Sequence, residues 1–167
     1  MELQKISGAF FVRKLTEEDV EAVYALCAEN PLFYQYCPPF VTRRSIREDM
    51  AALPPNTGFE NKYYAGFFDG ETLAAVMDLI LEYPDRETAF IGLFMMNRGY
   101  QGRGTGSSIV SDCVAYLAEE GFRRIRLAFA KGNPQSEAFW RKNGFSPTGV
   151  EIENQGYTAV VMERHLR

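Results

Sequence analysis

Three glycines alternate with other residues in the segment 101–106, which reads QGRGTG between an expected strand and an expected helix. The N–H groups of a first helical turn have no partner within the helix and lie at the positive end of its dipole. Glycine lets a phosphate approach such a backbone without a Cβ in the way. The segment therefore predicts a phosphate site, to which Gln101 and Arg103 add side-chain donors.

The spacing of these glycines argues against two common nucleotide sites. A P-loop needs GxxxxGK[ST], which the chain lacks, and the run departs from the GxGxxG of dinucleotide-binding folds. The preceding strand is also expected to be antiparallel to its neighbour, which does not suit a βαβ unit. The alternative is a glycine-rich turn from strand to helix that holds no ligand.

Other side chains that often carry chemistry are sparse. His165 is the only histidine and stands close to the C-terminus, which argues against Ser-His-Asp and Cys-His catalysis and against multi-histidine metal sites. Cys27, Cys37 and Cys113 are odd in number and share no CxxC spacing. We therefore expect reduced thiols and no metal site.

Composition narrows the class of protein. The 167 residues are 46% hydrophobic and 24% charged, which suits one globular domain over residues 1–167. A net charge of -4 argues against nucleic acid or an anionic membrane as the main partner. No apolar run approaches the roughly 20 residues of a membrane span, and the first residues lack the apolar core of a secretory signal. We expect a cytoplasmic protein.

The first half of the chain must supply the surroundings of the predicted phosphate site. Thr16 and the acidic residues after it begin a helix that ends near Asn30, and Thr42 begins a second helix that ends near Leu53. An aromatic and proline-rich loop, 32–40, is expected between them. A strand at 10–15 comes before this helix pair. Asp-Gly at 69–70 predicts a hairpin, and the strands expected from here are 62–68, 72–82 and 88–96.

After these strands the pattern changes to helix, strand, helix. Helical spacing of apolar residues predicts a helix at 104–120, and alternation predicts a strand at 124–130. Asn133 followed by proline is typical of a helix start, and this helix is expected to end near Asn143. Two terminal strands, 146–152 and 156–164, complete the prediction. The fold class is α/β (α+β), with a mixed, mostly antiparallel sheet of about seven strands and about four flanking helices.

With its elements in this order, the chain resembles the GCN5-related N-acetyltransferase (GNAT) family. The family motif Q/R-x-x-G-x-G/A, at a turn from strand to helix, fits residues 101–106. A second family feature is an Asn followed by an aromatic-rich helix that ends in Gly-Phe, here residues 133–145. The resemblance covers nearly the whole chain and implies the family fold, acetyl-CoA as co-substrate and no metal.

The resemblance also implies where coenzyme A would bind. The pyrophosphate would lie on the backbone N–H groups after Gln101, and the main chain of a strand would pair with the pantetheine arm. The implied cofactor contacts are Phe94, Met95, Met96, Gln101, Gly102, Arg103, Gly104, Thr105, Gly106, Asn133, Ser136 and Trp140. The alternative for Asn133 is a helix cap alone, and two of the three strand side chains fit equally well in the core.

The implied reaction is direct attack of a primary amine on the thioester. An alkyl amine with a pKa near 10 is about one part in a thousand neutral at pH 7, so a base or a desolvating site matters. The family's usual acid is a tyrosine where this chain has Trp140, whose indole N–H donates a hydrogen bond but does not transfer a proton. Because a coenzyme A thiolate is fairly stable, we interpret this as a rerouted step, with plain core packing of Trp140 as the alternative.

The base is not the family's usual glutamate, because the middle of the strand 88–96 has no acidic residue. Asp78 is the first substitute, since the Pro84-Asp85-Arg86 turn places it opposite about Gly92 in the middle of the sheet. Glu82 is the second and lies closer to the turn. The alternative for either residue is a charge with no catalytic role.

The resemblance leaves the acceptor open. Aromatic residues between the first two helices would wall the acceptor cleft, and acidic residues on the third and fourth strands favour a cationic small molecule or a peptide amine. Two rival hypotheses are a catalytically silent acyl-CoA-binding module and an interaction module. A homodimer is an expectation from the resemblance alone.

Overall fold

The computed structural model describes residues 1–166. Seven strands and five α-helices account for most of the chain, with short 3-10 turns between them. The strands are β1 (Phe11–Lys14), β2 (Lys62–Asp69), β3 (Thr72–Leu81), β4 (Thr88–Met96), β5 (Arg124–Ala130), β6 (Ser146–Asn154) and β7 (Tyr157–His165). The helices are α1 (Val20–Ala28), α2 (Pro31–Tyr36), α3 (Arg43–Ala51), α4 (Thr105–Glu119) and α5 (Pro134–Lys142).

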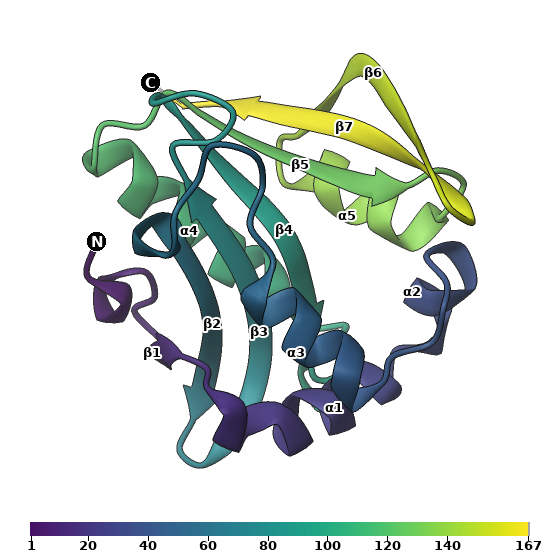
Figure 1. Ribbon diagram of the computed structural model, residues 1–167. Coiled ribbons are helices and arrows are strands. Elements are labelled where there is room, and N and C mark those ends of the chain that lie inside the picture. The colour runs from purple at the N-terminus through teal and green to yellow at the C-terminus, as the bar shows by residue number, and fades with distance from the viewer. Residues whose placement is uncertain (167) are drawn as a thin grey trace.

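The strands form a single sheet in the order β1-β2-β3-β4-β5-β7-β6. Every neighbouring pair is antiparallel except β4 and β5, which are parallel. That parallel ladder runs only from Thr88 paired with Arg124 to Ile91 paired with Leu127. Beyond Ile91 the two strands separate, as Figure 1 shows. The sheet is therefore forked between β4 and β5.

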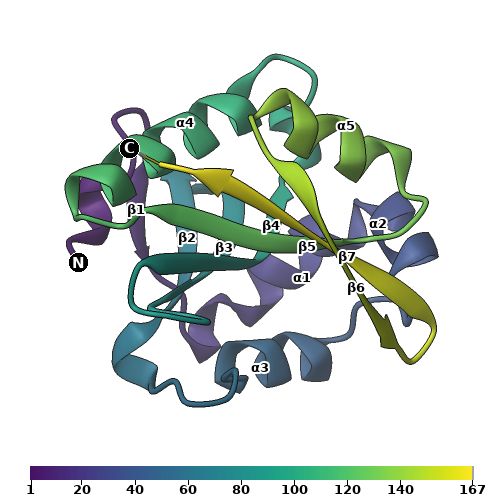
Figure 2. The same ribbon diagram turned by 90° about the horizontal axis from the view of Figure 1, so that it is seen from above.

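Helices cover both faces of the sheet. Seen from above, α4 and α5 lie on one side and α1 and α3 on the other (Figure 2). The larger core, with Phe67, Met77 and Leu127 at its centre, packs against α4 and α5. A second core, with Val23 and Ile46, packs α1 and α3 onto the other face. The predicted fold class is confirmed, with five α-helices in place of about four.

Local capping explains where these helices begin. Ser45 N–H donates to Thr42 Oγ1 at 3.0 Å, and Thr42 N–H donates to Ser45 Oγ at 2.9 Å. Such reciprocal bonds satisfy two backbone donors that a helix start leaves free. Asn133 caps α5 through its side-chain oxygen alone, which accepts from backbone N–H groups, and Pro134 occupies the first helical position. These starts lie where the sequence predicts them.

The prediction of a loop over 32–40 is wrong in its first part, because Pro31–Tyr36 forms α2. Pro31 occupies the first helical turn, where a fixed φ favours a helix and the missing N–H costs nothing. Aromatic packing supplies the rest: the ring of Tyr34 lies 4.9 Å from that of Phe33 and 5.2 Å from that of Phe40. Tertiary contacts of this kind override local propensity.

Candidate active site

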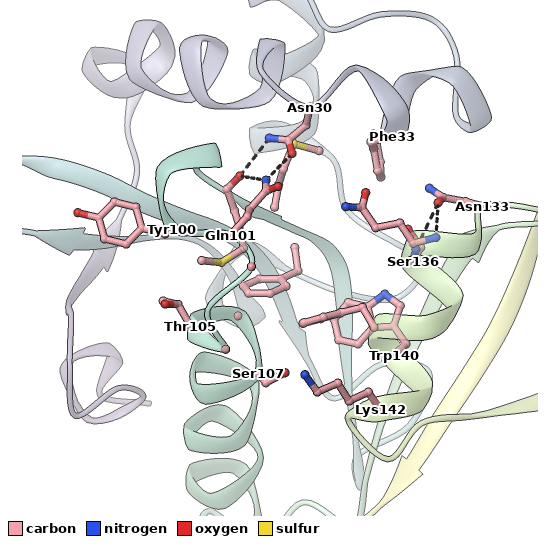
Figure 3. Close-up of a pocket in the computed structure, with 18 residues that line it drawn as sticks. Asn30, Phe33, Tyr100, Gln101, Thr105, Ser107, Asn133, Ser136, Trp140 and Lys142 are labelled. Carbon is pink, nitrogen blue, oxygen red and sulfur yellow. Dashed lines mark hydrogen bonds between the residues drawn. The ribbon is translucent and has the colours of Figure 1, made fainter.

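A cavity of about 370 Å³ opens at the fork, between the end of β4, the start of α4 and one face of α5 (Figure 3). Every predicted cofactor residue except Arg103 lines it. The other lining residues, none of them expected as a cofactor contact, are Asn30, Phe33, Tyr100, Ser107, Gln135, Phe139 and Lys142. Phe33 belongs to the aromatic segment that is expected to wall the acceptor cleft. Phe139 and Lys142 follow Ser136 at helical spacing, so a helical wheel of α5 would have found them. Asn30 carries no local signal of this kind.

The glycine segment enters α4 through left-handed backbone. Gly102 and Gly104 have φ of 75° and 80°, and Gly104 is the N-cap of α4. The first helical hydrogen bond runs from Ser108 N–H to Gly104 O at 3.0 Å. The N–H groups of residues 105–107 therefore precede the helical ladder and face the cavity end of the helix. An anion placed there would meet unpaired donors and the positive end of the dipole.

The two side chains expected to add donors at this loop lie differently. Gln101 lines the cavity, but its Nε2 already donates to Asn30 Oδ1 at 2.7 Å and to Met96 O at 3.0 Å. Arg103 is exposed and does not line the cavity; its guanidinium lies 4.9 Å from the ring centroid of Tyr100. Backbone N–H groups are thus the main donors at the loop.

The strand that forms one wall of the cavity has a free edge. β4 pairs with β3 along its length to Met96, but its ladder with β5 ends at Ile91. The main chain from Phe94 to Met96 therefore has no strand partner on the side that faces the fork, where an amide-rich arm would add as a strand does. The Met96 carbonyl already accepts from the side chains of Asn30 and Gln101. Met95 is 5% exposed and belongs to the core on the α1 side, whereas Phe94 and Met96 pack partly buried against the other core.

Asn133 and Trp140 both have a structural role that is visible without any ligand. Asn133 is 2% exposed, and its Oδ1 accepts from the N–H groups of Gln135 at 3.1 Å and Ser136 at 3.2 Å. Trp140 is 7% exposed and packs its ring 4.9 Å from Phe139. The helix-cap and core interpretations therefore hold, and a cofactor contact for either residue stays a prediction.

Asp78 lies at the closed end of the fork. It pairs with Leu93 on β4, and a bulge leaves Gly92 as the extra residue. A Cβ on Gly92 would lie 2.9 Å from Asp78 Oδ2, so the carboxylate occupies the space above this glycine. The predicted position opposite about Gly92 is close, and the bulge accounts for the difference in register.

The Asp78 carboxylate is buried but not alone. Lys62 Nζ donates to both of its oxygens at 3.0 Å, and the two side chains are 3% and 12% exposed for Lys62 and Asp78. Burial raises the pKa of Asp78, and the ammonium of Lys62 opposes that rise. Glu82, in contrast, is exposed in the turn after β3 with φ of 57°. Neither Asp78 nor Glu82 lines the cavity. Glu82 therefore has the position of a solvated charge at the end of a strand.

A second acidic group, which the sequence analysis missed, faces the same side of the sheet. Asp49 on α3 stands near Asp78 and Lys62, and it comes one helical turn after the buried Ile46. Its side chain is exposed to solvent, but nearby protein atoms still desolvate it in part. This burial, with a smaller effect from Asp78, raises the pKa of Asp49 to about 6.

The raised pKa of Asp49 predicts a pH-dependent cost to folding. Because the folded pKa exceeds the unfolded one, the folded protein binds more protons from about pH 4 to about pH 6, and stability falls as pH rises through this window. Asp49→Asn should therefore gain stability over the natural protein as pH rises, with the difference constant above about pH 7. Urea unfolding of both proteins across this range measures it, and a difference that does not change with pH would contradict the environment described here.

The structure describes neither a long apolar helix nor a metal cluster. Within residues 1–166 no helix is long and apolar enough to cross a membrane. The same part of the chain has no group of three or more His, Cys, Asp or Glu side chains placed to hold a metal ion. Cys27 and Cys113 are buried, which raises the pKa of their thiols to about 11 and about 12.

The forked mixed sheet and the glycine-lined helix start beside the fork define a class of α/β protein. The family described as the acetyltransferase (GNAT) family matches residues 21–145. This chain belongs to that family.

A curated protein is similar to part of this chain. Mycothiol acetyltransferase from Beutenbergia cavernae is 29% identical over 106 residues, which are 64% of this chain. The chain spans only 36% of the length of that curated relative. Such a partial match leaves the activity of the whole protein to be proposed.

Solved structures with the same fold share little sequence with this chain. An acetyltransferase from Thermus thermophilus superposes with a TM-score of 0.72 at 22% identity, over 93% of this chain and 96% of its own. An N-acetyltransferase from Thermoplasma acidophilum, solved in complex with coenzyme A, gives 0.67 at 16% identity, over 92% and 97%. An acetyl transferase from Salmonella typhimurium, which modifies the N-terminal serine of a ribosomal protein, gives 0.74 at 19%, over 97% and 98%.

Proposed function

We propose that this chain is one acyltransferase domain that moves an acetyl group from acetyl-CoA to a primary amine. The observation that carries the proposal is the unpaired N-terminus of α4, entered through Gly102 and Gly104, beside the free edge of β4. The pyrophosphate would meet the N–H groups of residues 105–107, and the pantetheine amides would pair along Phe94–Met96. The thioester would then point toward the closed end of the fork.

Asp78 is the base in this proposal. Its carboxylate lies over Gly92, the first residue beyond the β4–β5 ladder, and faces the side of α1 and α3 from which an acceptor would approach. Direct attack is favoured over an acyl-enzyme, because burial raises the pKa of the thiols of Cys27, Cys37 and Cys113 and none of the three lines the cavity. The leaving thiolate would take its proton from water, since Trp140 has none to give.

The acceptor is proposed to be a cationic amine. Asp49 and Asp78 both lie near the single ammonium of Lys62, so the group has an excess negative charge when both acids are ionised. An ammonium on the substrate would balance that charge. Tyr34 is partly exposed near Asp49, and its ring would offer a face to a cation. The ring of Tyr64 is buried, and the ammonium of Lys62 already lies 5.8 Å from its centroid.

A catalytically silent acyl-CoA-binding module is the second candidate. It is favoured by one observation, that an indole stands where a phenolic acid would serve the leaving thiol. Such a protein would bind coenzyme A without turning it over.

Thiol release from acetyl-CoA, measured with a panel of polyamines, amino acids and peptides, tests the proposal. Calorimetric titration with acetyl-CoA and with coenzyme A accompanies it. We expect binding and amine-dependent thiol release, greatest for acceptors with a second positive charge. Binding without release across the panel would favour the silent module, and no binding would reject both candidates.

A further inference from the structure

The side-chain amide of Asn30 joins three parts of the chain that are far apart in sequence (Figure 3). Its Oδ1 accepts from Gln101 Nε2 at 2.7 Å. Its Nδ2 donates to Met96 O at 3.0 Å and to Leu26 O at 2.9 Å. Gln101 Nε2 also donates to Met96 O at 3.0 Å. The end of α1, the end of β4 and the first residue of the glycine segment are thus held together by one closed set of hydrogen bonds.

Helix capping does not account for this use of Asn30. The residue stands at the N-cap of α2, yet its side chain makes no cap hydrogen bond there. Met96 is the last residue of β4, and its carbonyl lies beyond the ladder with β5, which ends at Ile91. The amide instead satisfies this carbonyl and the orphan carbonyl of Leu26 at the end of α1.

The glycine segment that Gln101 begins would be flexible without such a restraint. Gly102 and Gly104 both adopt left-handed backbone, and glycine loses more conformational freedom on ordering than any other residue. Asn97 lies four residues before the segment and makes a second set of hydrogen bonds. Its Oδ1 accepts from Gly99 N–H at 2.9 Å, and its Nδ2 donates to Leu73 O at 3.0 Å. Asn30 and Asn97 together fix the start of the segment against α1 and β3.

We propose that Asn30 is a positioning residue, which through Gln101 holds the glycine segment in the conformation that receives the pyrophosphate of acyl-CoA. This inference rests on the proposed function. Asn30 acts without touching the pyrophosphate: it orders the loop before the ligand arrives, and preorganisation of this kind is expressed as affinity. It also ties the helix pair on the acceptor side to the loop on the cofactor side.

Asn30→Ala removes the restraint and is expected to raise the Kd of coenzyme A about five- to twentyfold in calorimetric titration. Amide hydrogen exchange of residues 97–107 should be faster in the variant without any ligand present. The KM for acetyl-CoA should rise with it, while kcat at saturation changes little. Gln4→Ala is the matched control, because Gln4 is an exposed amide in the N-terminal turn, which contacts Tyr116 near the other end of α4.

Charged substitutions at Asn30 and Gln101 test the same hydrogen bonds. Asn30→Asp keeps an acceptor for Gln101 but loses both hydrogen-bond donors. It also places a carboxylate against the carbonyls of Met96 and Leu26. The Kd of coenzyme A should therefore rise at least as far as in Asn30→Ala. Combining it with Gln101→Arg supplies a positive donor to that carboxylate. The pair should recover most of the lost affinity.

Failure of the proposed function and failure of the inference about Asn30 give different results. No binding of coenzyme A by the natural protein would overturn the proposed function and this inference with it. Binding by the natural protein with unchanged Kd and unchanged exchange in Asn30→Ala would overturn the inference alone. A fall in Tm with an unchanged Kd, measured well below Tm, would also overturn it, because that result describes a merely structural residue.

Discussion

Gly104→Val is expected to weaken coenzyme A binding about ten- to a hundredfold. Gly104 has φ of 80° and caps α4, and a β-branched residue is strained in this conformation. The valine would either keep the left-handed backbone at a cost of about 1–2 kcal/mol or turn the following N–H groups away from the ligand. Its methyl groups would also stand at the cavity wall. Calorimetric titration with coenzyme A measures the change.

Gly121→Val separates this effect from backbone strain alone. Gly121 has φ of 96°, a Cβ there would also meet no atom within 4 Å, and the residue lies outside the cavity lining. Both variants should lose a similar part of the free energy of unfolding, and only Gly104→Val should lose affinity. Equal affinity in the two variants would show that the pyrophosphate lies elsewhere.

The sequence predicts the fold well where local chemistry decides it. Thr42 and Asn133 are helix caps in both the sequence and the structure, and the Asp69-Gly70 turn joins β2 to β3. Each of these signals depends on residues a few positions apart. Alternating burial then gives β5, whereas β3 is buried along nearly its whole length and β6 is exposed throughout.

The parts that the sequence did not predict depend on contacts between distant residues. α2 needs the edge-to-face contacts of the rings around Tyr34. Asn30 is recognisable only when Gln101 is folded against it, 71 positions along the chain. Asp49 looks like any exposed helical acid until β3 places Asp78 nearby. Local propensity carries no information about such partners.

Asp78 is an intermediate case. Its place in the middle of the sheet follows from the hairpin register, which the sequence supports. Its partner Lys62 comes from β2, 16 positions earlier, where a lysine at the start of a strand gives no reason to expect a buried ammonium. The bulge at Gly92, where the carboxylate finds room, is also not predictable from the sequence.

Removing the Asp78 carboxylate is expected to lower kcat for amine acetylation about 10²- to 10⁴-fold, the usual contribution of a general base. Asp78→Asn alone would leave Lys62 buried without a counter-ion, and breaking such a pair costs about 3–5 kcal/mol of stability. The informative variant is therefore Asp78→Asn combined with Lys62→Met, which removes both charges. Thiol release at saturating acetyl-CoA measures kcat, and Tm reports that the variant is folded.

Lys62→Met alone then distinguishes a base from a structural ion pair. Lys62 holds the pKa of Asp78 down against the effect of burial, so its removal must raise that pKa. If Asp78 accepts the proton of the amine, kcat rises with pH as the carboxylate ionises. Lys62→Met should then shift this rising limb of the pH profile of kcat to higher pH while keeping much of the maximal rate. A limb that stays in place, with activity retained in the double variant, would assign the pair to stability and leave the desolvated cleft to deprotonate the amine.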